Sequence, residues 1–203
     1  MAHRIEVLDL RPAPGRSKAA MAWVAHLDDQ TKLLARDLED ITPAELQWQP
    51  KPGMNTIGML LAHLAIVEVF WLHVAEQHAT EENMRKCLGI GTDDDGMPLK
   101  PGGDPPGGLR GRTFKYYLKL MRRARAHTTK HVSRYRDADL ARSITRTRRN
   151  GQRQRVSLRW ILYHVAEHFS GHYGQILLLR HLYRDRGKNE FARPAKPSAR
   201  RSS

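Results

Sequence analysis

Residues 157–180 are the most constraining stretch of the chain, because they contain no proline and their apolar residues recur three and four positions apart. This spacing predicts one long, largely buried helix, and Ser157 is suited to cap its start. Three histidines, His164, His168 and His172, lie four residues apart on one face of that helix. One helical turn rises about 5.4 Å, so an adjacent pair can reach a single metal ion, whereas His164 and His172 cannot share one.

Two interpretations of this histidine face remain open. A single histidine on an apolar helix face is usually a core residue whose ring nitrogens are hydrogen-bonded. Three histidines on one buried face each need a partner of their own, which is harder to provide. A pair spaced four apart supplies two metal ligands, and a catalytic site then needs a third ligand from elsewhere in the chain.

Apolar periodicity predicts three further helices before this one. The first runs from about Ser17 and stops before Thr42 and Pro43, which start one short helical turn. The others cover residues 57–75, capped by Asn55 or Thr56, and about residues 113–135, with a basic outer face.

Two polar residues interrupt the apolar helix 57–75. His63 stands among leucines and needs a partner in space, because nothing polar is near it in the sequence. Glu68 is expected either to accept a hydrogen bond from a ligand residue or to face solvent.

Two segments between the helices are rich in turn-forming residues. Residues 87–111 contain clusters of aspartate, proline and glycine, which predict a long mobile loop, either a lid near a pocket or a disordered insertion. It is not a calcium-binding EF-hand loop, because Gly91 and Gly102 occupy two of the ligand positions. Residues 144–156 contain an Asn150-Gly151 turn signal and predict a polar loop or a marginal hairpin.

These elements predict an all-α fold, a four-helix bundle with a long loop between the second and third helices. We expect residues 1–16 to form an N-terminal arm, residues 17–185 the bundle, and residues 186–203 a basic, disordered tail. Metal sites in such bundles are built in the core from residues on facing helices, so His63 can join His168 and His172.

Charge and composition bound the classes of function. The formal net charge of +14 makes a nucleic-acid partner possible. We favour a solvated basic surface, because the sequence lacks a basic recognition helix, an RNA-binding aromatic signature and zinc-finger spacing. The sequence contains no run of eighteen uncharged apolar residues, so we expect no membrane span. The N-terminus lacks the apolar stretch of a signal peptide. The single cysteine, Cys87, fits a cytoplasmic protein.

Two motifs resemble those of the DinB/YfiT-like superfamily of metal-binding four-helix-bundle proteins, and the similarity covers about residues 21–183. The first is Thr56-Ile-Gly-Met-Leu-Leu-Ala-His63-Leu-Ala-x-x-Glu68. The second is Leu158-Arg-Trp160-x-x-x-His164-x-x-Glu167-His168-x-x-x-His172-x-Gly174-Gln175. The Arg-Trp opening and the Gly-Gln close of the second motif are similar to the branch related to mycothiol-dependent enzymes.

The resemblance implies a divalent metal ion, typically zinc or nickel, with coordination positions open to water or substrate. Members with known activity use low-molecular-weight thiols for S-transfer or isomerisation, others are described as hydrolases, and many are homodimers. The implied ligands are His63, His168 and His172. The residues implied to orient ligands, line the pocket or contact substrate are Tyr163, His164, Glu167 and Gln175.

We therefore expect a metal-dependent enzyme, a low-molecular-weight-thiol S-transferase or a hydrolase. Its basic surface would attract a small anionic substrate. The alternative is a non-enzymatic basic bundle with a structural metal, associated with stress responses or DNA. A third possibility is a helical interaction module with a polar histidine core and no metal. An open coordination position distinguishes the first class from the second.

Overall fold

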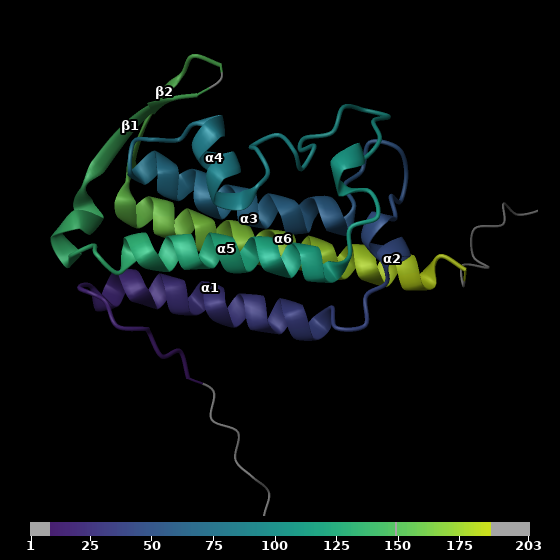
Figure 1. The fold of residues 1–203 in the computed structure, drawn as a ribbon, viewed down its shortest axis with the longest axis horizontal. Coiled ribbons are helices and arrows are strands. Elements are labelled where there is room, and N and C mark those ends of the chain that lie inside the picture. Colours follow the sequence, from purple (N-terminus) through teal and green to yellow (C-terminus); the bar gives the residue numbers. More distant parts are fainter. Residues whose placement is uncertain (1–8, 149, 188–203) are drawn as a thin grey trace, which may run out of the picture.

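The computed structural model describes residues 9–148 and 150–187. Four long helices form a bundle (Figure 1). They are α1 (Lys18–Asp37), α3 (Ile57–Ala75), α5 (Phe114–Val132) and α6 (Leu158–Asp185). The expected all-α bundle is therefore confirmed. Most of the expected arm and tail, residues 1–8 and 188–203, lies outside the described residues.

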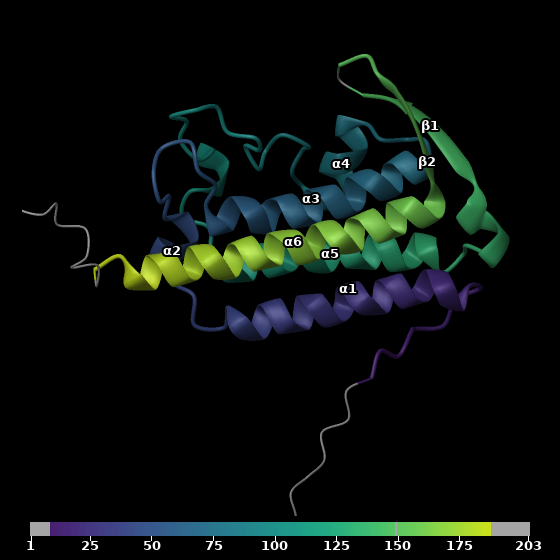
Figure 2. The ribbon, with the colours of Figure 1, turned by 180° about the vertical axis from the view of Figure 1, so that it is seen from behind.

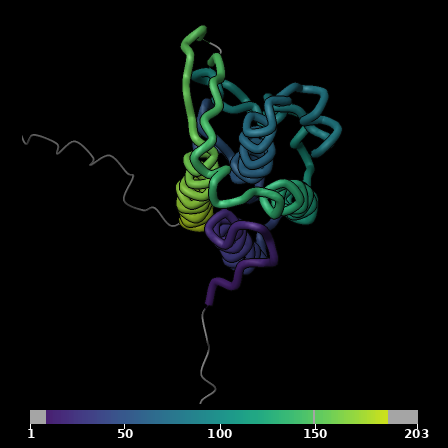
Figure 3. The backbone as a smooth tube through the Cα atoms, turned by 90° about the vertical axis from the view of Figure 1, so that its left-hand side faces the viewer, coloured from purple at the N-terminus to yellow at the C-terminus, as the bar shows by residue number. Residues whose placement is uncertain are grey.

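In cross-section the four helices occupy the corners of a square, with α1 diagonally opposite α3 and α5 diagonally opposite α6. Helix α3 contacts both α5 and α6, and α1 contacts the same two helices from the other side. The end-on view shows this arrangement (Figure 3). Because α3 and α6 are neighbours, residues on their facing sides can meet in the core.

Side-chain caps explain why the helices begin where they do. The Ser157 hydroxyl accepts a hydrogen bond from the Trp160 N–H at 3.1 Å, and the Thr56 hydroxyl accepts one from the Met59 N–H at 3.1 Å. Each such bond satisfies an N–H group that has no partner inside its helix. Ser157 caps α6 as the sequence predicts, and of the two candidates for α3 the cap is Thr56 rather than Asn55.

Helix α3 is the centre of the core. Sixteen of its nineteen residues are buried, which matches a sequence that is apolar on most sides. Within the described part of the chain, α3 is also the one helix long and apolar enough to cross a membrane. Of its most apolar window, 83% is buried inside the bundle, so packing against its neighbours accounts for its apolar character.

Two helical elements differ from the sequence-based expectation. Helix α1 ends at Asp37, earlier than predicted, whereas α2 (Pro43–Gln47), capped by Thr42, is the short helical turn that the sequence predicts. Helix α4 (Glu81–Leu88) was not predicted, although the sequence carries its signals. Thr80 caps its start, two glutamates occupy its first turn, and Gly89 ends it with φ +82°.

The loop after α4 is held in place by polar contacts. The Arg85 guanidinium donates to both carboxylate oxygens of Asp94 at 2.9 and 3.1 Å, and the Gly91 N–H donates to Asp94 Oδ2 at 2.9 Å. A short 3₁₀ turn, η1 (Gly107–Leu109), follows before α5. These contacts contradict the interpretation of this segment as a disordered insertion. Figure 2 shows it running along α3.

The segment before α6 forms the hairpin, not the loop, of the two predicted alternatives. After the 3₁₀ turn η2 (Asp137–Ala141), strands β1 (Ser143–Thr147) and β2 (Arg153–Ser157) pair antiparallel. Ser143 lies opposite Ser157, so the hairpin leads directly into the first turn of α6. It rises from one end of the bundle on the side where α4 lies (Figures 1 and 2).

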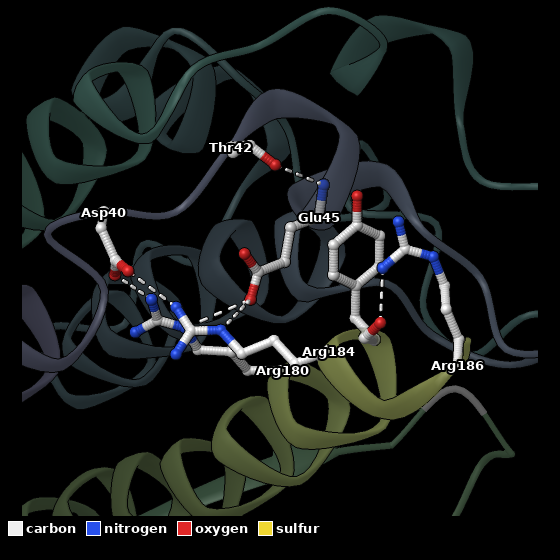
Figure 4. A network of polar contacts seen from close by, with 7 residues as sticks. Asp40, Thr42, Glu45, Arg180, Arg184 and Arg186 are labelled. Carbon is white, nitrogen blue, oxygen red and sulfur yellow. Dashed lines mark hydrogen bonds and ion pairs between the residues drawn. The ribbon is translucent and has the colours of Figure 1, made fainter. Parts of the chain in front are cut away.

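An ionic network fixes the C-terminal part of α6 against α2 (Figure 4). Arg180 Nε donates to the buried Glu45 carboxylate at 3.1 Å, and a second nitrogen of Arg180 contacts Asp40. Arg184 donates to the other Asp40 oxygen at 2.8 Å. Glu45 is itself placed by the Thr42 cap, so the register of α6 is tied to the start of α2.

Candidate metal centre

Three histidines from α3 and α6 converge in the bundle. His63 Nε2 lies 3.1 Å from His168 Nε2, and His172 Nε2 lies 3.1 Å from the same atom. The donor atoms of all three lie within 4.8 Å of one another. His168 and His172 are one turn apart on α6, and α3 supplies the third ring from the opposite side, as the bundle geometry predicts.

Hydrogen bonds to the outer nitrogens fix the tautomers of two of these rings. His63 Nδ1 lies 2.7 Å from Asp95 Oδ2, and His172 Nδ1 lies 2.8 Å from Gln175 Oε1. A carboxylate and an amide oxygen can only accept, so both Nδ1 atoms carry the proton. The Nε2 atoms of His63 and His172 therefore present bare lone pairs toward His168.

His168 cannot satisfy both of these lone pairs. Its Nε2 carries at most one hydrogen, so at least one lone pair in the cluster has no donor. Burial, followed by the neighbouring His172 and His63, lowers the pKa of His168 to about 3. Burial also lowers the pKa of His172, although the Gln175 hydrogen bond opposes this shift. Low pKa values disfavour protonation as the remedy at neutral pH, so the arrangement suits a cation other than a proton.

The residues fit a divalent transition metal. Imidazole nitrogen is a ligand that zinc and nickel accept, and two of the three rings donate their outer N–H to an oxygen acceptor, as metal-ligating histidines usually do. Three protein ligands are the usual number for a site that keeps a position open.

Asp95 is a candidate site residue that the sequence does not single out. It is 1% exposed, and its second oxygen accepts from the Met97 N–H at 2.9 Å, which fixes the carboxylate in the turn. Thirty-two residues separate it from His63, so no local pattern could have linked the two. The only signal in the sequence is its place in an aspartate-rich turn, within a loop for which a lid is one of the two predicted roles.

Two further residues that the sequence singled out lie on α6 beside the cluster. His164 stacks on Trp160 with ring centres 4.6 Å apart and meets Trp71 edge-on at 5.1 Å. Its Nδ1 lies 3.2 Å from the exposed Glu167 carboxylate. His164 thus sits next to the triad, 5.7 Å from the His168 ring centre, without joining the three converging nitrogens.

Tyr163 and Glu68 lie elsewhere. Tyr163 is 47% exposed, and its ring meets Trp23 of α1 edge-on. Both Glu68 oxygens accept hydrogen bonds from Arg125 of α5, at 2.9 and 3.2 Å. Arg125 also reaches Asp28 of α1 at 2.6 Å, so Glu68 belongs to an ionic network that joins three helices. Glu68 neither orients a histidine nor faces solvent.

A cavity of about 600 Å³ opens beside the triad. Helix α3, the loop that carries Asp95 and strand β1 surround it. His63 and Asp95 contribute its polar wall next to the metal centre. Its apolar wall consists of Ile66, Val67, Phe70, Val74 and Met97.

Arg146 of β1 brings a positive charge to this cavity. Its guanidinium carbon lies 4.6 Å from the Trp71 ring centre and 5.5 Å from that of Phe70. One of its terminal nitrogens is buried and has no hydrogen-bond partner among the described residues. Burial and the neighbouring Arg148 lower the pKa of Arg146.

A family model described as the DinB superfamily matches residues 26–176, which include all three histidines of the cluster. The chain belongs to the DinB superfamily. A crystal structure titled as the conserved protein of a locus from Enterococcus faecalis has the same fold, with a TM-score of 0.57 and 16% sequence identity. The match covers 79% of this chain and 94% of that one. No curated protein matches the sequence of this DinB-superfamily chain.

Proposed function

We propose that this protein is a metal-dependent enzyme that activates a low-molecular-weight thiol, or water, for reaction with a small anionic substrate. The observation that carries the proposal is the convergence of three Nε2 atoms, from His63, His168 and His172, beside a cavity. An ion in such a site lowers the pKa of a thiol or of water and so supplies a nucleophile near neutral pH.

The chain's own residues would hold and orient the ion. His63, His168 and His172 would be the ligands, and zinc or nickel suits their nitrogens. Asp95 and Gln175 hold two of the rings in the tautomer that exposes Nε2. Three ligands rather than four favour a catalytic role over the structural alternative.

The cavity supports the choice of substrate class. Its apolar wall would accept the carbon skeleton of a small molecule, while the Arg146 guanidinium would attract a carboxylate or a similar anion. A thiol or second substrate that carries a carboxylate meets both requirements.

Binding of thiols to the cobalt-loaded protein tests the proposal. The probes are mercaptosuccinate, which carries two carboxylates, and neutral 2-mercaptoethanol, followed by the near-ultraviolet absorption that a thiol produces on binding cobalt. We expect Arg146→Ala to weaken binding of mercaptosuccinate by about tenfold or more, the loss of one charge-assisted hydrogen bond, and to leave 2-mercaptoethanol unaffected.

The matched control is Arg155→Ala, which removes an exposed arginine from the other strand of the same hairpin. It should change neither affinity. An absence of thiol-dependent absorption in a protein that has bound cobalt would contradict thiol activation. Equal losses in the two arginine variants would contradict the role of Arg146 and point to a general effect of surface charge.

A further inference from the structure

A second group of histidines lies where the C-terminal end of α3 packs against α5. His73 is in the last turn of α3, and His127 and His131 are one turn apart on α5. His78 follows α3 in the turn that leads to α4. Each of the four rings contacts two of the others, so that together they form a closed ring of contacts. They belong neither to the two sequence motifs described above nor to the proposed function.

The turn that ends α3 brings the rings of His73 and His78 together. The His78 N–H donates to the His73 carbonyl at 2.9 Å, and the Gln77 N–H donates to the Val74 carbonyl at 3.1 Å. This is the Schellman pattern, which requires a left-handed residue between them, and Gln77 adopts φ +60°. A left-handed conformation is unfavourable for a residue other than glycine.

The side-chain contact that accompanies this motif is normally apolar, but here two imidazoles make it. The ring centres of His73 and His78 are 4.8 Å apart. His73 also meets His127 at 4.9 Å, and His127 meets His131 at 4.4 Å. The ring of contacts closes between His78 and His131 at 6.5 Å.

Three of these separations, 4.8, 4.9 and 4.4 Å, are close to those of ligands that share one ion, whereas His78 and His131, at 6.5 Å, lie farther apart. A metal–nitrogen bond of about 2.0 Å places a ring centre roughly 3 Å from the ion, so tetrahedral ligands have ring centres roughly 5 Å apart. The rings of the His63 centre obey the same relation, with separations of 4.9, 5.0 and 4.3 Å.

Unsatisfied nitrogens point to a missing ligand. His73 is 2% exposed, and its Nδ1 is buried without a hydrogen-bond partner among the described residues. His127 Nε2 is in the same condition. His78 Nδ1 lies 3.1 Å from the Glu76 carbonyl, which can only accept, so His78 Nε2 carries a free lone pair. Buried polar atoms without partners are uncommon and costly.

Carboxylate charge is available beside the cluster. One carboxylate, Glu76, lies 3.9 Å from His131 Nδ1 and is held by the Tyr135 hydroxyl, so negative charge is at hand.

We propose that His73, His78, His127 and His131 form a second divalent-metal site, which joins the end of α3 to α5. Four protein ligands would close the coordination sphere, so its role is structural rather than catalytic. Within residues 9–148 and 150–187, only the His63 centre already has three donor atoms within 4.8 Å. Loading the second site therefore requires ring rotation, and we expect it to bind more weakly than the first.

Titration with cobalt alone, on the full chain without a histidine tag, tests the site independently of the proposed function. The starting variant carries His63→Ala, His168→Ala and His172→Ala, so the first centre cannot contribute. We expect it to bind one equivalent of cobalt, with visible absorption of a nitrogen-ligated ion. Adding His127→Gln and His131→Gln should weaken that binding by more than about 100-fold. Loss of a residue that only hydrogen-bonds a ligand weakens metal binding by about 10- to 100-fold, so a larger loss indicates that ligands themselves were removed.

Controls and a second measurement keep the test decisive. His26→Gln and His181→Gln, added to the same starting variant, remove histidines from α1 and from the exposed end of α6 and should change nothing. The unfolding temperature of the starting variant should rise with cobalt, and that of the His127→Gln, His131→Gln variant should not. A folded starting variant, checked by circular dichroism, that binds no cobalt would overturn the proposal. So would undiminished binding after the loss of His127 and His131.

Discussion

Asp95 decides which nitrogen of His63 faces the metal centre. Because its carboxylate accepts from Nδ1, the lone pair on Nε2 is free to bind an ion. We expect Asp95→Asn to weaken zinc affinity by about 10- to 100-fold, since the amide can present its donor to the ring and no longer contributes negative charge. Competition with a chromogenic chelator measures this change.

The control for this substitution is Asp104→Asn, an exposed aspartate in the same loop. Its removal lowers the net negative charge of the loop equally and should leave zinc affinity unchanged. Equal affinity in the Asp95→Asn variant and the wild type would show that Asp95 does not support the ligand.

Glu68 stabilises the fold and does not take part in the candidate metal site. Its carboxylate is 2% exposed and balances the buried Arg125, so Glu68→Gln leaves that guanidinium with Asp28 as its remaining carboxylate partner among the described residues. Breaking a buried ion pair costs about 3–5 kcal/mol of unfolding free energy. Urea denaturation should show a loss of this size, while metal content stays at the wild-type level. Glu82→Gln, at an exposed position on α4, should have little effect. Reduced metal content in a folded Glu68→Gln protein would contradict this division of roles.

At the scale of elements, the loop between α4 and α5 supports the histidine cluster through Asp95. Gly96 has φ +72°, and a Cβ there would lie 2.8 Å from Pro106 Cδ. We expect Gly96→Ala to displace the turn that carries Asp95 and to weaken zinc binding, in addition to a backbone cost of about 1–2 kcal/mol. The same chelator competition and a urea titration measure the two effects.

Gly107→Ala is the matched control, because a Cβ at Gly107 would meet nothing within 4 Å. It should leave zinc affinity at the wild-type value. If Gly96→Ala lowers stability but not zinc affinity, the loop positions Asp95 less strictly than the contacts suggest.

The four bundle helices could be predicted from sequence because their signals are local. Apolar periodicity and capping residues such as Ser157 and Thr42 act within one or two turns, and the structure uses both caps. Helix α4 is short and has only two buried residues, so its caps were the sole evidence for it. The hairpin register depends on pairing across a turn, which Asn150-Gly151 could suggest but not decide.

The site could be predicted only as far as its residues repeat on a helix. His168 and His172 follow from their spacing, and His63 from the facing helix in a bundle. Asp95 and Arg146 come from a loop and a strand, and their positions relative to α3 depend on the path of the chain in space. The partner of Glu68 lies 57 residues away on α5, so its role could not be read from α3 alone.

At the scale of the whole molecule, the buried histidines link stability to pH. The pKa of a histidine is about 6.5 in the unfolded chain, whereas burial lowers the pKa of His73 and His127 to about 4 in the folded protein. Between these values the unfolded chain binds more protons than the folded one, so stability falls as the pH is lowered from about 6.5 to about 4. Urea midpoints of the metal-free protein across this range measure the slope.

The His127→Gln variant should show a shallower slope, because one of the contributing groups is gone. His181→Gln removes an exposed histidine and should not change the slope. A wild-type stability that is constant between about pH 6.5 and 4 would contradict the buried, neutral state of these rings.

The homodimer expected from the sequence stays a prediction, and so does a cytoplasmic location. Three exposed leucines on α6 offer apolar surface for self-association: Leu177, Leu178 and Leu182. They lie toward the C-terminal end of the helix, beyond His168 and His172. Association through this face would therefore leave the cavity beside β1 accessible to substrate.

The most direct test is the metal content, by elemental analysis, of protein purified without a histidine tag, in the wild type and in two single variants. His168→Ala removes the ring at the centre of the triad, and His164→Ala removes the neighbouring ring that stacks on Trp160. We predict that His168→Ala contains one equivalent less of zinc or nickel than the wild type, and that His164→Ala contains the same amount. Wild-type metal content in His168→Ala would contradict the metal centre, as would a wild-type protein that takes up neither ion on incubation.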